Sequence, residues 1–146
     1  MGVTFASPMR SIDITYSGMA RLRCCIVHMI SAEFCAQYAA FFDHQCDGET
    51  DAVTARLNDM IAEYELAHGD ECDPVFEFLF ASDADGILDC AGCDALKKLI
   101  SADPQKHSEL ESLRIGYEGW AHPATGADFM RLLDESAEAQ TALTWY

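Results

Sequence analysis

Residues 78–100 read FLFASDADGILDCAGCDALKKLI, and this stretch constrains the fold more than any other part of the chain. An aromatic, apolar segment runs into an acidic turn that contains Asp83, Asp85 and Gly86, and a second apolar periodicity follows the turn. Such a pattern is typical either of a calcium-binding loop or of a tight structural turn between two helices. The two alternatives predict different chemistry for the same few side chains.

The ligand count decides between them. If Ala81 is position 1 of a calcium loop, Asp83 and Asp85 fall on positions 3 and 5. The frame fails at its ends, because position 1 is Ala and position 12 is Gly92 in place of the bidentate Glu. We therefore predict a structural helix-turn-helix corner without a bound cofactor, in which the aspartates accept backbone hydrogen bonds and Ile87 enters the core.

Cys90 and Cys93 form a CxxC pair at the start of the second helix, where a helix dipole lowers a thiol pKa. A redox site would need a βαβ setting, and the flanking pattern is helical. A zinc site would have to draw its other ligands from isolated residues, namely His44, Cys46, His68 and Cys72. Neither is favoured. The odd number of cysteines, seven, on largely apolar faces indicates a reducing compartment without disulfides.

The periodicity along the chain predicts a mostly helical α+β protein. Alternation predicts strands, and three- to four-residue apolar spacing predicts helices. The expected strands are residues 11–16 and 141–146, the expected helices are 19–30, 31–42, 53–64, 75–80, 89–100 and 126–139, and the expected loops are 43–51 and 116–123. Asp103 and Pro104 end one helix or open a short further turn. We expect a single domain over residues 1–146, with a small antiparallel sheet in which residues 11–16 pair with the C-terminal strand.

Charge and hydropathy exclude several classes of function. The chain carries 9 Lys+Arg against 25 Asp+Glu, a formal net charge of −16, so direct binding to a nucleic-acid backbone is not expected. Either the acidity serves solubility, or the chain acts as an acidic decoy for a basic nucleic-acid channel. No apolar run reaches the roughly 18 residues of a membrane span, and the N-terminus has no stretch of signal-peptide length. We expect a cytoplasmic protein that does not bind membranes.

One hydroxyl-bearing and cationic cluster stands out, formed by Tyr16, Ser17, Arg21 and Arg23. It could hold an anion at a helix N-terminus, or its arginines could pair with surface carboxylates. The histidines occur singly, and no hydrolase or nucleotide-binding motif is present, so no catalytic residue is predicted.

Three segments together resemble a group of small uncharacterised proteins encoded by bacterial prophages and other mobile elements. The segments are IDITYSGMARLR, FLFASDADGILDCAGCDALKKL and FMRLLDESAEAQTALTWY. The group shows a YSGF-like start with a following Arg, here Tyr16, Ser17, Gly18 and Arg21, with Met19 where an aromatic is usual. It also shows an FLxxSDxxG turn with a Cys seven residues after the glycine, here Phe78, Leu79, Ser82, Asp83, Gly86 and Cys93. The resemblance implies no catalytic residue and makes Cys90 incidental.

We therefore expect a non-enzymatic protein that binds a host macromolecule, for example a host protein of a defence or nucleic-acid-binding system. The alternative is a small-ligand or metal-binding protein. Its site would join the turn residues Ser82, Asp83, Asp85 and Gly86 to Tyr16, Ser17 and Arg21 in one concave pocket.

Overall fold

The computed structural model describes residues 2–30, 85–117, 119 and 121–146. Between positions 31 and 84 it describes only individual residues, which are Ala36, Ala55, Asn58, Asp59, Ala62, Glu63, Leu66, Val75, Phe78 and Leu79. The helices expected over 31–42 and 53–64 and the loop over 43–51 therefore lie largely or wholly outside the described residues. Of the helix expected over 75–80, the three described residues are helical and buried.

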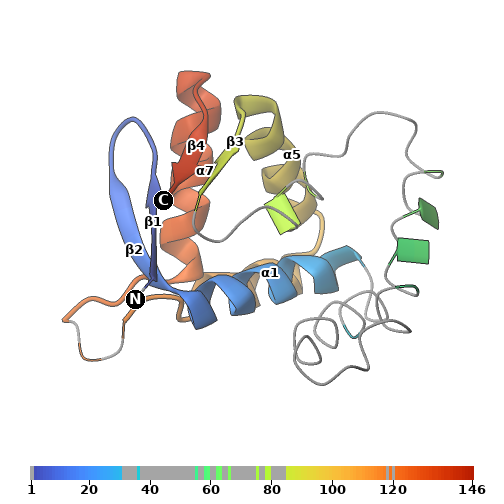
Figure 1. Cartoon of the computed structure of the whole chain (residues 1–146), viewed down its shortest axis with the longest axis horizontal. Coiled ribbons are helices and arrows are strands. Elements are labelled where there is room, and N and C mark those ends of the chain that lie inside the picture. The colour runs from blue at the N-terminus through green and yellow to red at the C-terminus, as the bar shows by residue number, and fades with distance from the viewer. Residues whose placement is uncertain are drawn as a thin grey trace.

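A four-stranded antiparallel sheet joins the two ends of the chain (Figure 1). The strands are β1 (Gly2–Ala6), β2 (Ser11–Thr15), β3 (Gly86–Leu88) and β4 (Leu143–Trp145), and their order across the sheet is β2-β1-β4-β3. Apolar Val3, Phe5 and Ile14 alternate with more exposed residues along β1 and β2, so one face of this hairpin is buried. The predicted α+β class, with N- and C-terminal strands in one sheet, is confirmed.

The predicted pairing of residues 11–16 with the C-terminal strand is wrong. Strand β1, which the sequence analysis did not assign, lies between them and pairs with β2 on one side and with β4 on the other. Phe5 is the partner of Ile12 across one ladder and of Trp145 across the other. The turn that follows β1, with Ser7 donating to the carbonyl of Arg10 at 2.9 Å, closes the hairpin that places β1 in the middle.

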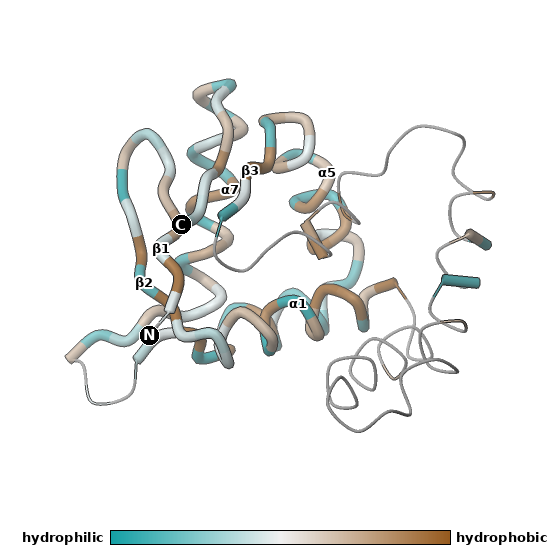
Figure 2. Tube along the Cα trace, in the orientation of Figure 1, coloured by the Kyte–Doolittle hydropathy of each residue, from teal (hydrophilic) through white to brown (hydrophobic). Residues whose placement is uncertain are grey.

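Four described helices pack around the sheet: α1 (Tyr16–Ile30), α5 (Cys90–Ser101), α6 (Pro104–Ser112) and α7 (Gly126–Ala139). In Figure 1, α7 runs alongside the strands and α1 crosses at their lower end. Hydrophobic and hydrophilic positions alternate along α1 in Figure 2, as an amphipathic helix requires. The predicted bounds of α7 are confirmed residue for residue. None of the described helices is long and apolar enough to cross a bilayer.

The helix starts follow their capping residues. Asp89 accepts a hydrogen bond from the Gly92 amide at 2.7 Å and is the N-cap of α5. Asp103 accepts from the Lys106 amide at 3.2 Å, with Pro104 in the first turn, so this dipeptide opens a nine-residue helix instead of a short turn. Thr125 and Asp128 form a capping box at the start of α7.

An aromatic cluster lies at the centre of the core. Phe5, Phe78, Phe129 and Trp145 are all at most 1% exposed, and neighbouring ring centroids lie 5.4 to 6.4 Å apart. Edge-to-face and tilted contacts at these separations are favourable for aromatic rings. The four rings come from β1, the segment before β3, α7 and β4. The cluster therefore holds together parts of the chain that are distant in sequence.

Candidate functional site

The start of α1 is docked against the segment around Arg114 and Ile115. Thr15 caps the helix by accepting from the Gly18 amide at 2.8 Å, and its own amide donates to the Ile115 carbonyl at 3.0 Å. A Cβ on Gly18 would lie 2.0 Å from the carbonyl oxygen of Ile115, so only glycine allows this approach. Arg21 donates to the Arg114 carbonyl from Nε at 3.1 Å and Nη2 at 2.9 Å. Gly18 and Arg21, both part of the YSG-type motif, thus hold α1 in place.

Arg23 does not join Arg21 in one anion site. Residues two positions apart on a helix point to nearly opposite faces. Arg23 is 4% exposed, and its guanidinium carbon lies 5.4 Å from the centroid of the Phe78 ring. Arg23 therefore packs inside as a cation over an aromatic face, on the other side of α1 from Arg21.

The acidic turn ends in a strand. Gly86–Leu88 form β3, so the expected helix-turn-helix corner is wrong at this point, and Ile87 is 67% exposed instead of entering the core. Gly86 pairs with Trp145, and a Cβ there would lie 2.0 Å from the indole ring, which explains the glycine. Asp85 is exposed. Ser82 and Asp83 lie outside the described residues.

The described parts of the proposed two-part pocket lie on opposite borders of the sheet. Tyr16 and Ser17 follow β2, whereas Gly86 belongs to β3, and β1 and β4 separate the two strands. Three strand spacings amount to on the order of 14 Å. Neither described hollow, detailed below, has Tyr16, Ser17, Arg21, Asp85 or Gly86 in its lining.

The CxxC pair consists of two free thiols in different environments. Cys93 is fully buried and its thiol donates to the Leu88 carbonyl at 3.8 Å, whereas Cys90 is half-buried. Desolvation by burial, with the nearby charge of Asp89, raises the pKa of Cys93 to about 11. The thiol is therefore protonated at neutral pH and is a poor nucleophile. Among the described residues, no group of three or more His, Cys, Asp or Glu side chains could hold a metal ion.

A hollow of about 170 Å³ lies between α5, α6 and α7. Its lining combines Ile100, Met130 and Leu133 with Lys97, Ser101, His107 and Asp134. The Lys97 ammonium lies 3.0 Å from an oxygen of Asp134, and this hydrogen bond raises the pKa of Lys97. Because Asp134 already neutralises the lysine, the hollow does not present a cationic site for an anion.

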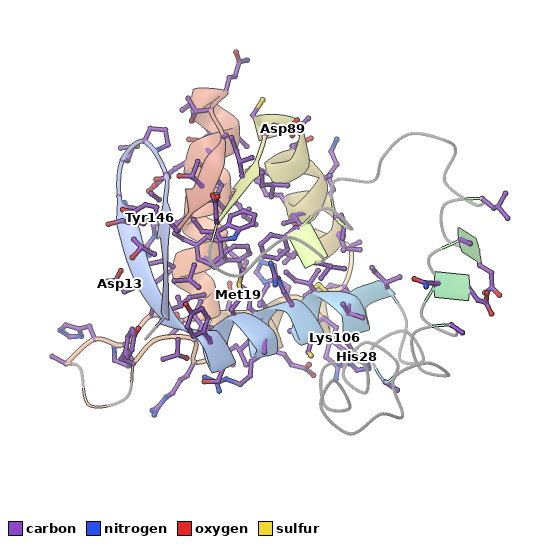
Figure 3. The ribbon with its side chains drawn as sticks, in the orientation of Figure 1. Asp13, Met19, His28, Asp89, Lys106 and Tyr146 are labelled. Carbon is purple, nitrogen blue, oxygen red and sulfur yellow. The ribbon has the colours of Figure 1, made fainter. Side chains whose placement is uncertain are left out.

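A second hollow, of about 250 Å³, runs beside strand β2. Ser11, Ile12 and Asp13 line one side of it, and His122, Ala124 and Asp128 line the other. The sequence analysis did not single out Asp13, His122 or Asp128, which lie far apart in the chain. Figure 3 shows Asp13 on the outer side of the hairpin. Strand β2 is the end strand of the sheet and pairs with β1 on its inner side. Its outer edge therefore borders the hollow.

Charge is unevenly distributed along the chain. Thirteen of the 25 acidic residues, but only Arg56 of the nine cationic ones, lie at positions 31–84. In the rest of the chain the cations are largely matched. Five of them lie 2.7 to 3.9 Å from carboxylates, in the pairs Arg10–Glu135, Lys97–Asp134, Lys98–Asp94, Lys106–Glu109 and Arg131–Asp128.

The chain matches no family model, no curated protein and no solved structure.

Proposed function

We propose that the protein is a non-enzymatic binding protein of the mobile-element type. Its partner is a host protein with a basic surface, such as a nucleic-acid channel, which the acidic chain would occupy as a decoy. The observation that carries this proposal is the concentration of charge: residues 31–84 hold thirteen acidic residues and a single arginine. A surface that is acidic only for solubility needs no such segregation, because the remainder of the chain also has to stay soluble.

The mode of binding follows from electrostatics. A dense anionic segment attracts a cationic surface over roughly a Debye length, about 8 to 10 Å at physiological salt, and accelerates association. Such binding weakens as salt rises. A cytoplasmic location belongs to this proposal, because the described thiols of Cys90 and Cys93 are free, as a reducing compartment favours.

The alternative, a ligand or metal site at the turn and the start of α1, receives less support. Arg21 is engaged with a backbone carbonyl, Arg23 lies under Phe78, and Gly86 is fitted to the Trp145 indole. Among the described residues, Arg21 and Gly86 of the recurring motifs, and Arg23 beside them, thus make contacts within the fold.

The experiment is capture from a nuclease-treated bacterial lysate on the immobilised protein, with elution by a DNA duplex and identification by mass spectrometry. We expect basic nucleic-acid-binding proteins to be retained at about 50 mM salt, and to be released by the duplex and by about 300 mM salt. Retained proteins that the duplex fails to displace would contradict the decoy mechanism.

A further inference from the structure

The outer edge of strand β2 offers unused backbone hydrogen-bonding groups. In a strand, the N–H and C=O of one residue point to the same side, and those of the next residue point to the other. The Thr15 amide donates to Ile115, away from β1. By this alternation, the backbone groups of Ser11 and Asp13 also point away from β1. Among the described residues, none of the backbone bonds outside the strands and helices involves Ser11 or Asp13.

These groups face a preformed groove. The hollow of about 250 Å³ lies along Ser11, Ile12 and Asp13, and its far wall is formed by His122, Ala124 and Asp128. At about 30 Å³ per water molecule, the hollow holds roughly eight waters, enough for the backbone of a short extended segment.

Backbone bonds fix both the far wall and the end of the groove. The Ala124 carbonyl accepts from Ile115 at 3.0 Å and from Gly116 at 2.9 Å. The bond from Thr15 to Ile115 closes the groove where β2 ends. Along the described strand β2, an entering strand therefore meets a stop at Thr15 and finds free positions at Ser11 and Asp13.

Both walls carry carboxylates held in position. Asp13 accepts from the Thr4 hydroxyl at 2.6 Å, and Asp128 accepts from the Thr125 amide at 2.9 Å. The Arg131 guanidinium lies 3.9 Å from the Asp128 carboxylate, and the Arg131 side chain is 56% exposed. This ion pair is therefore loose. The chain as a whole carries −16, so a second copy would be repelled, whereas a cationic segment is attracted.

We propose that the β2 edge is a docking groove for an extended, lysine- or arginine-rich segment of a partner protein. The segment adds as an antiparallel fifth strand, exchanges backbone hydrogen bonds with Ser11 and Asp13, and places a cationic side chain opposite Asp13. This proposal does not rest on the proposed function of residues 31–84, since it uses other residues and another kind of contact.

The test uses a fluorescent heptapeptide that alternates lysine with valine. Two comparison peptides have the same length: one carries N-methyl groups on its backbone amides, and one has glutamate in place of lysine. We expect the lysine peptide to bind and to protect the Ser11 and Asp13 amides from hydrogen exchange. Equal binding of the N-methylated or the glutamate peptide would overturn the proposal. So would protection that appears elsewhere and not at Ser11 and Asp13.

Two variants of the protein complete the test. Ser11→Pro removes an outward-facing amide at a position where an edge strand tolerates proline, and it should weaken binding more than about tenfold. Asp13→Asn keeps an acceptor for Thr4 and should weaken binding about two- to fivefold. Asp94→Asn, the control, removes the same charge from α5 and should leave the peptide affinity unchanged.

Unchanged affinity in Ser11→Pro, with the melting temperature of the protein retained, contradicts the groove. Should Ser11→Pro fail to fold, the comparison of Asp13→Asn with Asp94→Asn decides, because both substitutions are conservative. Equal loss in these two variants would mean general charge attraction and would overturn the site. Dimerisation of the free protein through this edge, seen by sedimentation and abolished by Ser11→Pro, would assign the edge to a second copy instead.

Discussion

The balance of acidic and cationic residues differs between two parts of the chain. In residues 1–30 and 85–146, twelve acidic and eight cationic residues occur, and the described carboxylates largely cap helices or lie beside cations. Residues 31–84 contain thirteen acidic residues and a single arginine. The first part uses charge locally, while its stability rests on the aromatic core. The second has no comparable set of cations of its own, and we infer that a partner supplies them.

The largest effect should come from the aromatic core. Trp145 is 1% exposed, lies in β4 between β1 and β3, and contacts Phe5 and Phe78. Trp145→Ala should lower the free energy of unfolding by about 3 to 5 kcal/mol, measured by urea denaturation. Tyr146→Ala, next to it but 67% exposed, is the control and should cost little. Similar losses in both variants would show that β4 is not anchored by burial.

The buried thiol of Cys93 should make stability depend on pH in the alkaline range. Its pKa rises from 9.0 to about 11 in the folded protein, so the folded state keeps the proton more tightly. This contribution is complete below pH 9 and is lost as the pH rises towards 11. The loss should amount to about 2 to 3 kcal/mol by linkage.

The contribution of Cys93 can be isolated by substitution. Cys93→Ala should flatten the loss between pH 9 and 11, followed by urea denaturation across that range. Cys90→Ala, at the half-buried neighbour in the same CxxC, should keep it. Identical pH profiles for the two variants would remove Cys93 as the cause.

A smaller effect distinguishes the helix-capping carboxylate of Asp89 from the surface carboxylate of Asp94. Asp89→Ala removes the side chain that caps α5 and should cost about 1 kcal/mol. Asp94→Ala removes an exposed ion pair with Lys98 on the same helix and should cost less than about 0.5 kcal/mol. Thermal melts at low and high salt can check this, because the exposed ion pair should weaken with salt more than the cap hydrogen bond does. The reverse ranking would mean that the surface ion pair stabilises the fold more than the helix cap does.

The sequence predicted those features that local patterns determine. The helix expected from residue 89 and the bounds of α7 follow from residue types within a few positions. Strand β1 was missed because GVTFA is short and its alternation rests on only Val3 and Phe5. The position of β4 beside β1 then could not be deduced, since strand order depends on contacts between distant segments.

The candidate sites show the same limit. Helical geometry alone places Arg21 and Arg23 on opposite faces, and this signal was available in the sequence. The groove beside β2, in contrast, is lined by both Asp13 and Asp128, which lie 115 positions apart in the sequence. No spacing rule connects two such residues. Gly18 and Gly86 stand at positions of the recurring motifs. Their close approaches to Ile115 and Trp145 explain by packing why these residues are glycines.

The central claim is that the acidity of residues 31–84 serves binding and not folding. Its most direct test neutralises six carboxylates in that segment and six elsewhere, and compares capture from lysate at about 50 mM salt. The first variant carries Asn or Gln at Asp43, Asp47, Glu49, Asp59, Asp70 and Glu71. The second, with the same change in net charge, carries them at Asp85, Asp94, Glu109, Glu111, Asp134 and Glu138. We predict that the first variant keeps its melting temperature and loses its captured proteins, while the second retains them. Equal retention by both variants would contradict the claim.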